Sequence, residues 1–248
     1  MKAAVWYGRE DLRIEDVPEP AVGKDQVKIR VRWCGICGSD VHEYREGPMI
    51  ISKKPHPLTG KSSPVILGHE FSGDVVAVGE GVRRIKAGDR VTINCLIYCG
   101  RCPFCLEGEY NMCLRLATVG LAWDGAFAET VVVPEYTVLK LPDSVTYEMA
   151  TFAEPLAVAV RAVKRSRLKV GDTAVVVGTG PIGLLVMQAA LVGLVAAVHE
   201  EAVDAGGDAG GAQGVDEMRL APRAVAQAAR PRNAGGEAEE TRKAEGEP

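Results

Sequence analysis

The chain has 248 residues, of which 47% are hydrophobic and 25% charged, so it is long enough to bury one good core and part of a second. Its formal net charge of −4 argues against nucleic acid as a partner, because such proteins carry a basic surface that neutralises phosphates. No apolar run is long enough to cross a bilayer and no signal peptide is recognisable, so the sequence predicts a cytoplasmic protein without a membrane partner.

The first part of the chain predicts a β-rich domain. Short segments rich in β-branched residues, each bounded by Gly, Pro or Asp, are typical of strands. The predicted strands are residues 2–7, 26–33, 71–78, 90–93 and 126–133. Closely spaced turn residues between them favour a small barrel over a parallel sheet. Helix is predicted later, over residues 146–164, with Pro155 opening a second helix in its first turn.

Beyond residue 172 the pattern changes to the first β-α of a dinucleotide-binding fold. A buried strand is predicted over residues 173–177 and an apolar helix over 181–192. Between them lies Gly178-Thr-Gly180-Pro181-Ile182-Gly183, whose glycines permit a tight turn and close approach of the backbone to a pyrophosphate. We interpret Gly178, Gly180, Pro181, Ile182 and Gly183 as residues that bind NAD.

The remaining segment, residues 193–248, has an atypical composition. Of its 56 residues 23 are Ala or Gly, and it contains no Ile, Phe, Tyr, Trp or Cys. Such a segment buries too little apolar surface to offset its ordering entropy, so it is predicted to be disordered. One hypothesis is a frameshifted end to a truncated chain, since a GC-rich gene read out of frame yields this composition; a natural disordered or helical tail is the alternative.

The cysteines predict a metal site. The chain has seven, and Cys99, Cys102, Cys105 and Cys113 lie within fifteen residues. Four thiolates at this spacing are what a closed, tetrahedral Zn²⁺ site requires, and such a site stabilises a fold rather than catalysing a reaction. Free or redox-active thiols are the alternative.

A second metal site is predicted from Cys34-Gly-Ile-Cys37 and the turn Gly68-His69-Glu70. The CxxC pair alone also fits a thioredoxin-like redox motif, but no helix-forming run follows it in the sequence. A mixed set of Cys, His and Glu ligands with one free position is typical of catalytic zinc.

Several strings together resemble a known family. Cys37-Gly-Ser-Asp40, Gly68-His69-Glu70, the four-cysteine segment and Glu154-Pro155 occur in the order seen in zinc-dependent medium-chain alcohol dehydrogenases of the sorbitol, threonine and butanediol branch. The extended segment from Pro55 to Glu70 is most similar to 2,3-butanediol dehydrogenases. The resemblance covers residues 1 to about 192.

The resemblance implies an α/β protein with a GroES-like β-barrel catalytic domain over residues 1–172, an incomplete Rossmann domain begun by residues 173–192, and the atypical tail over 193–248. It implies two zinc ions per chain, one catalytic and one structural, and an NAD cofactor. Cys37 and His69 are implied as ligands of the catalytic zinc, with Glu70 and Glu154 as carboxylates that ligate it or exchange with water. A homo-oligomer is implied for the intact family.

The same resemblance places a hydroxyl and a histidine on the path of the released proton, at Ser39 and His42. Their alternative roles are a turn-capping hydroxyl and a surface helix residue. His56 is interpreted as a loop residue, and Cys34 and Cys95 as small packed hydrophobic residues.

Two functions remain open from the sequence. The first is NAD-linked hydride transfer between a secondary alcohol or vicinal diol and its ketone. The second is a zinc-binding β-barrel module without activity, because the acidic residue expected about twenty positions after the glycine turn matches poorly at Glu200 and Glu201.

Overall fold

The computed structural model describes residues 1–178 and 180–204, with side chains as far as residue 192. Its strands are β1 (Lys2–Gly8), β2 (Asp11–Asp16), β3 (Gln26–Gly35), β4 (Val65–Ile66), β5 (Glu70–Val78), β6 (Arg90–Ile93), β7 (Leu96–Ile97), β8 (Ala117–Thr118), β9 (Thr130–Pro134) and β10 (Val138–Lys140). Its helices are α1 (Gly38–Glu46), α2 (Pro103–Leu106), α3 (Tyr147–Thr151), α4 (Ala153–Arg165) and α5 (Pro181–Asp204), with 3₁₀ turns at Tyr110–Met112 and Glu135–Thr137.

The strands form three antiparallel sheets. The largest has the order β10-β6-β5-β3-β9, a second has the order β2-β1-β4, and β7 pairs with β8. The prediction of a β-rich first part is confirmed, although the strand predicted from residue 126 begins at Thr130. Strand β2 was not predicted. Its residues Asp-Leu-Arg-Ile-Glu-Asp are mostly charged, and β1 pairs with its whole length.

The largest core cluster lies on the five-stranded sheet. Val27 and Ile29 of β3 are two residues apart and completely buried, as period-two alternation requires, and they pack with Val91 of β6 and Val133 of β9. Each such side chain stabilises the fold by roughly 1.5–3 kcal/mol through burial. The rigid barrel that results supports every candidate ligand described below.

Helix α1 corrects a prediction, because a helix does follow the CxxC pair. Cys37 is its N-cap, and the Asp40 carboxylate accepts a hydrogen bond from the Cys37 backbone N–H at 2.9 Å. The helix has little apolar character and buries only Asp40 and Glu43. It is stabilised by this capping and by Trp6, whose indole N–H donates to the Glu43 carbonyl at 3.1 Å, neither of which hydrophobic periodicity detects.

Helices α3 and α4 confirm the predicted helical region. The Thr146 hydroxyl caps α3 by accepting from the Met149 N–H, and Pro155 lies in the first turn of α4 as predicted. Two hydroxyls of the large sheet hold α3 in place: Ser72 donates to the Tyr147 carbonyl at 2.7 Å, and Thr92 donates to the Ala150 carbonyl at 3.2 Å.

The strand predicted over residues 173–177 is wrong. The segment is not assigned to a strand, and Val175 and Val177 are 85% and 95% exposed. A parallel strand forms only against a neighbouring strand, and no strand pairs with this segment among the residues that the structure describes.

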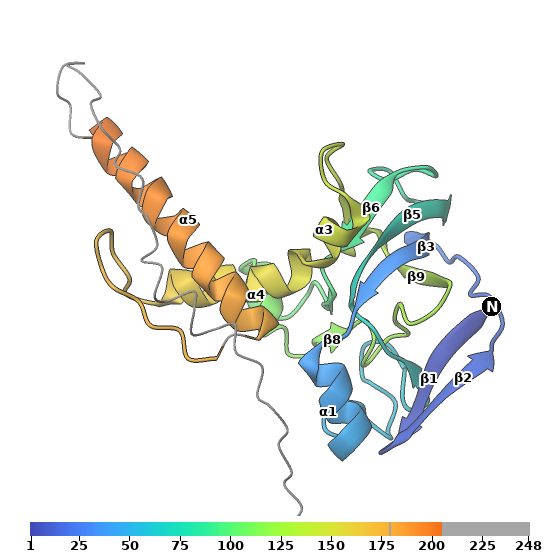
Figure 1. Cartoon of the computed structure of the whole chain (residues 1–248). Coiled ribbons are helices and arrows are strands. Elements are labelled where there is room, and N and C mark those ends of the chain that lie inside the picture. Colours follow the sequence, from blue (N-terminus) through green and yellow to red (C-terminus); the bar gives the residue numbers. More distant parts are fainter. Residues whose placement is uncertain (179, 205–248) are drawn as a thin grey trace, which may run out of the picture.

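Helix α5 begins at Pro181 as predicted, but it continues to Asp204 instead of ending near residue 192. The helix therefore includes Glu200 and Glu201, which matched the expected acidic position poorly, and the first part of the segment predicted to be disordered. The rest of that predicted tail, residues 205–248, lies outside the described residues. Helix α5 packs against α4. In Figure 1 these two helices lie to the left of the sheets, and β1 and β2 lie at the lower right. None of the described helices has the length and apolarity that crossing a membrane requires.

Candidate metal centres

Four cysteines converge in one short lobe. The Sγ atoms of Cys99, Cys102, Cys105 and Cys113 all lie within 4.8 Å of one another. The lobe folds through two glycines with positive φ, Gly100 at 69° and Gly108 at 82°, a conformation that other residues rarely adopt. Backbone N–H groups point at the sulfurs: those of Cys99 and Arg115 donate to Cys113 Sγ at 3.3 and 3.4 Å.

The electrostatics of this lobe fit a cation. Hydrogen bonds from the backbone of Leu114 and Cys105 lower the pKa of Cys102 to about 6, so this sulfur is readily a thiolate. Burial, with the neighbouring Cys102 sulfur, raises the pKa of Cys105 to about 12. Neighbouring thiolates repel one another, so these four cysteines do not all ionise without a cation. Zn²⁺ suits the site because it stabilises all four thiolates.

A second centre forms where β3, α1 and β5 meet. One ligand atom each from Cys37, His69 and Glu70 lies within 4.8 Å of the others. Cys37 caps α1, while Glu70 is the first residue of β5. The close approach depends on Gly35 of β3, since a Cβ atom at that position would lie 2.5 Å from Glu70 Oε2.

His69 is held by two neighbours from α1. Its Nε2 lies 3.4 Å from Ser39 Oγ, and its Nδ1 lies 3.5 Å from Asp40 Oδ1. His69 and Asp40 are only 4% and 3% exposed, and within the described part of the chain Nδ1 and Oδ1 have no hydrogen-bond partner. A carboxylate beside the second nitrogen of a histidine orients the ring toward a metal. Sequence reasoning assigned Asp40 no role, although it belongs to the string Cys37-Gly-Ser-Asp40.

The carboxylates of the second centre also fit a cation. Burial raises the pKa of Glu70, and the nearby charge of Glu154 raises it further. Burial likewise raises the pKa of Asp40, although the charge of His69 opposes that effect. A bound divalent ion reverses both effects, because it favours the ionised carboxylates.

Glu154 lies in the first turn of α4, outside the group that Cys37, His69 and Glu70 form. It contacts Cys95, whose Sγ donates to Glu154 Oε1 at 3.5 Å. Burial and the Glu154 charge both raise the pKa of Cys95, so its thiol stays protonated at neutral pH. Cys95 is buried in the core as the sequence predicts, and it is also a polar neighbour of Glu154. Cys34 is half-buried, and its thiol donates to the Gly35 carbonyl at 3.5 Å.

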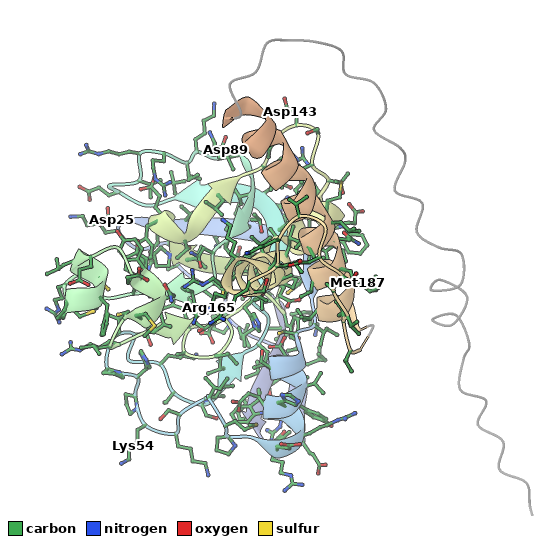
Figure 2. The ribbon with its side chains drawn as sticks, turned by 90° about the vertical axis from the view of Figure 1, so that its left-hand side faces the viewer. Asp25, Lys54, Asp89, Asp143, Arg165 and Met187 are labelled. Carbon is green, nitrogen blue, oxygen red and sulfur yellow. The ribbon has the colours of Figure 1, made fainter. Side chains whose placement is uncertain are left out.

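The two other histidines of the site region differ in setting. His42 is exposed on α1, three residues after Ser39. His56 lies in the loop between α1 and β4, which carries Lys54 at its outer end (Figure 2). Its Nε2 lies 3.1 Å from the Leu116 carbonyl and its Nδ1 accepts from the Leu58 N–H, so His56 anchors this loop.

The glycine segment from Gly178 to Gly183 is described except for residue 179. Gly178 has a φ of 96°, and a Cβ at Gly183 would lie 2.0 Å from the Gly178 carbonyl oxygen. Pro181 and Ile182 open α5, and the Leu184 N–H donates to the Gly180 carbonyl at 3.0 Å.

Comparison with known proteins relates the chain to dehydrogenases. Residues 23–143 match the family model described as the alcohol dehydrogenase GroES-like domain. An (R,R)-butanediol dehydrogenase from Bacillus subtilis is 50% identical over 191 residues, which are 76% of this chain and 54% of the relative. The chain is therefore similar to zinc-dependent alcohol dehydrogenases over the first three quarters of its length. The α/β fold class, with a GroES-like sheet followed by part of a Rossmann-type region, is confirmed.

Other family members show the same extent of similarity. A sorbitol dehydrogenase from Bacillus subtilis is 40% identical over 77% of this chain and 52% of its own. The crystal structure of 2R,3R-butanediol dehydrogenase from Bacillus subtilis aligns with a TM-score of 0.72 and 49% identity, covering 79% of this chain and 55% of that one. A zinc-binding dehydrogenase from Sinorhizobium meliloti bound to NADP aligns with a TM-score of 0.68 and 37% identity, covering 77% of this chain and 53% of that one. The chain thus spans about half the length of these family members.

Proposed function

We propose that this chain carries the metal-binding half of an oxidoreductase that interconverts a secondary alcohol or vicinal diol, of the 2,3-butanediol and acetoin type, with its ketone by hydride transfer to a nicotinamide cofactor. The observation that carries the proposal is the convergence of Cys37, His69 and Glu70 on one point, with Asp40 behind the histidine. The identity to butanediol dehydrogenases supports the substrate class.

In this proposal Cys37, His69 and one of the two glutamates, Glu70 or Glu154, hold zinc. When bound there, zinc supplies Lewis-acid polarisation of a substrate oxygen. Asp40 Oδ1, 3.5 Å from Nδ1 of His69, would favour the orientation of the ring in which Nε2 faces the metal. The cysteine lobe holds the second zinc and has no open position for substrate, so its role is structural.

The proton that the alcohol loses leaves through α1. Ser39 lies beside His69 in the partly buried site, and His42 is exposed to solvent on the same helix. Residues three apart face the same side of a helix, so Ser39 and His42 form a short path from the centre to water.

The cofactor site in this proposal is the turn from Gly178 to Gly183. In this proposal the first turn of α5, which follows Gly178 and Gly180, presents its backbone N–H groups to a phosphate. We propose NAD as the nicotinamide cofactor.

The test uses the full chain, purified and analysed for zinc, with NADH binding followed by fluorescence and turnover of 2,3-butanediol by absorbance. We expect two zinc ions per chain in the native protein and one in Cys37→Ser, with saturable NADH binding in both and turnover only in the native chain. Zinc at both centres without NADH binding or turnover would contradict the proposed activity and leave a metal-binding module.

A further inference from the structure

Cys95 occupies a fixed position between β6 and β7. Its carbonyl accepts a hydrogen bond from the Val119 N–H at 2.9 Å, and the N–H of the preceding Asn94 donates to the Thr137 carbonyl at 2.8 Å. The side chain is only 5% exposed and belongs to the core cluster of the large sheet. The barrel therefore determines where the Cys95 thiol points.

The partner of this thiol belongs to a different part of the molecule. Glu154 lies in the first turn of α4, at a joint with α3 that the hydroxyls of Ser72 and Thr92 attach to the sheet. The contact between Cys95 Sγ and Glu154 Oε1 at 3.5 Å joins residues 59 positions apart in sequence. It is within range of a hydrogen bond to sulfur, and it ties the start of α4 to the barrel.

Glu154 is one of the two glutamates proposed above to hold the metal with Cys37 and His69. It lies outside the group that Cys37, His69 and Glu70 form, so the direction of its side chain decides whether it can reach the metal. A carboxylate on the first turn of a helix has several rotamers, so something must select the one that faces the centre.

We propose that Cys95 is a positioning residue for the metal centre, whose thiol holds one oxygen of Glu154 and leaves the other free to face Cys37, His69 and Glu70. This inference rests on the proposed metal centre. Hydrogen-bonded neighbours that orient a ligand typically change metal affinity by about 10- to 100-fold when they are lost. Because sulfur is a weak donor, we place Cys95 at the lower end of that range.

The test uses the full chain loaded with Co²⁺, with affinity measured by competition with a chelator and geometry read from visible absorption. Cys95→Val keeps an apolar side chain of similar size but has no donor, and Cys95→Ser keeps a donor. The matched control is Thr137→Val, which removes a buried donor that bonds the Pro134 carbonyl and keeps a side chain of similar size. The cysteine lobe contributes equally to all four chains and cancels in the comparison.

We expect Cys95→Val to bind one of its two Co²⁺ ions about tenfold more weakly, with altered d–d absorption, while Cys95→Ser and Thr137→Val stay within about twofold of the native chain. In the Glu154→Gln background, Cys95→Val should add no further loss, because the carboxylate that it positions is gone.

Three results would overturn the inference. Equal affinity in Cys95→Val and the native chain shows that the thiol positions nothing, and equal losses in Cys95→Ser and Cys95→Val show that packing matters rather than a donor. Weaker thiolate-to-cobalt absorption in Cys95→Ser shows that Cys95 is itself a ligand. If the native chain binds only one Co²⁺, the proposed function fails before any variant is made, so the two failures are distinguishable.

Discussion

The barrel and the segment from residue 173 to Asp204 contain similar apolar sequences with different outcomes. In the barrel, Val27 and Ile29 are completely buried, because β3 has neighbours on both edges. In the second region, Val175 and Val177 are almost fully exposed, although their segment is as rich in β-branched residues as any strand of the barrel. An apolar, β-branched sequence therefore forms a strand only where a partner strand is present.

The largest expected effect concerns the metal in the lobe. Cys105→Ser removes a buried member of the four-cysteine cluster, and zinc bound to such a cluster contributes on the order of 10 kcal/mol. We expect the zinc content to fall by one ion per chain and a protease to cut between residues 99 and 113. Zinc analysis and mass spectrometry of the fragments measure both effects, and Cys34→Ser is the control. Resistance to cleavage without zinc would show that the barrel alone holds the lobe.

The contrast between the two regions is tested by shortening one apolar side chain to alanine in each region. Ile29→Ala leaves a cavity in the core of the barrel, and we expect a loss of about 2–5 kcal/mol in the free energy of unfolding. Val177→Ala removes an exposed side chain, and we expect a change within about 0.5 kcal/mol. Urea denaturation of both variants measures the difference. A loss above about 1 kcal/mol in Val177→Ala would mean that the segment packs in solution.

A third prediction concerns the close contact that shapes the second centre. In Gly35→Ala the new Cβ lies 2.5 Å from Glu70 Oε2, so the carboxylate must move and metal affinity should fall about tenfold, equivalent to about 1.4 kcal/mol. The matched control is Gly38→Ala, where a Cβ meets nothing within 4 Å. Its helical position predicts unchanged affinity and a slightly more stable α1. Competition with a chelator gives both affinities. Equal affinities in the two variants would show that Glu70 does not bind the metal.

The smallest expected effect concerns the attachment of α3 to the barrel. Burial opposes ionisation of Asp74 on β5, but hydrogen bonds from Tyr147 and Arg32 lower its pKa overall. Because the folded pKa is depressed, the stability that Asp74 contributes is present above its unfolded pKa near 3.9 and is lost as pH falls through the folded value.

Asp74→Asn should therefore cost about 0.5–1 kcal/mol at pH 7, and the difference from the native chain should shrink as the solution is acidified below about pH 4. Tyr147→Phe removes the hydrogen bond but keeps the carboxylate, so it should show a smaller loss. Urea titrations at several pH values measure both variants. A difference that does not change with pH would assign the effect to packing instead of charge.

The sequence by itself determined the features that depend on short-range spacing. Four cysteines within fifteen residues lie close together in any compact fold, and the start of β3 alternates buried and less buried residues, so the lobe and β3 are predictable from local pattern. Strands β5 and β6 bury consecutive residues and are recognised by their apolar, β-branched composition. The turn at Gly178 is predictable for the same reason, since only glycine adopts its backbone conformation easily.

Tertiary structure decided what depends on partners distant in sequence. Helix α1 exists because Cys37 and Trp6 stabilise a segment without apolar periodicity, and Asp40 reaches His69 only because that helix forms. The role of Cys95 depends on Glu154, 59 positions away. The absence of strand pairing at residues 173–177 follows from what lies beside them, not from their own composition. Burial, hydrogen bonding and strand pairing all act between groups that the fold brings together, and local spacing in the sequence does not determine these long-range contacts.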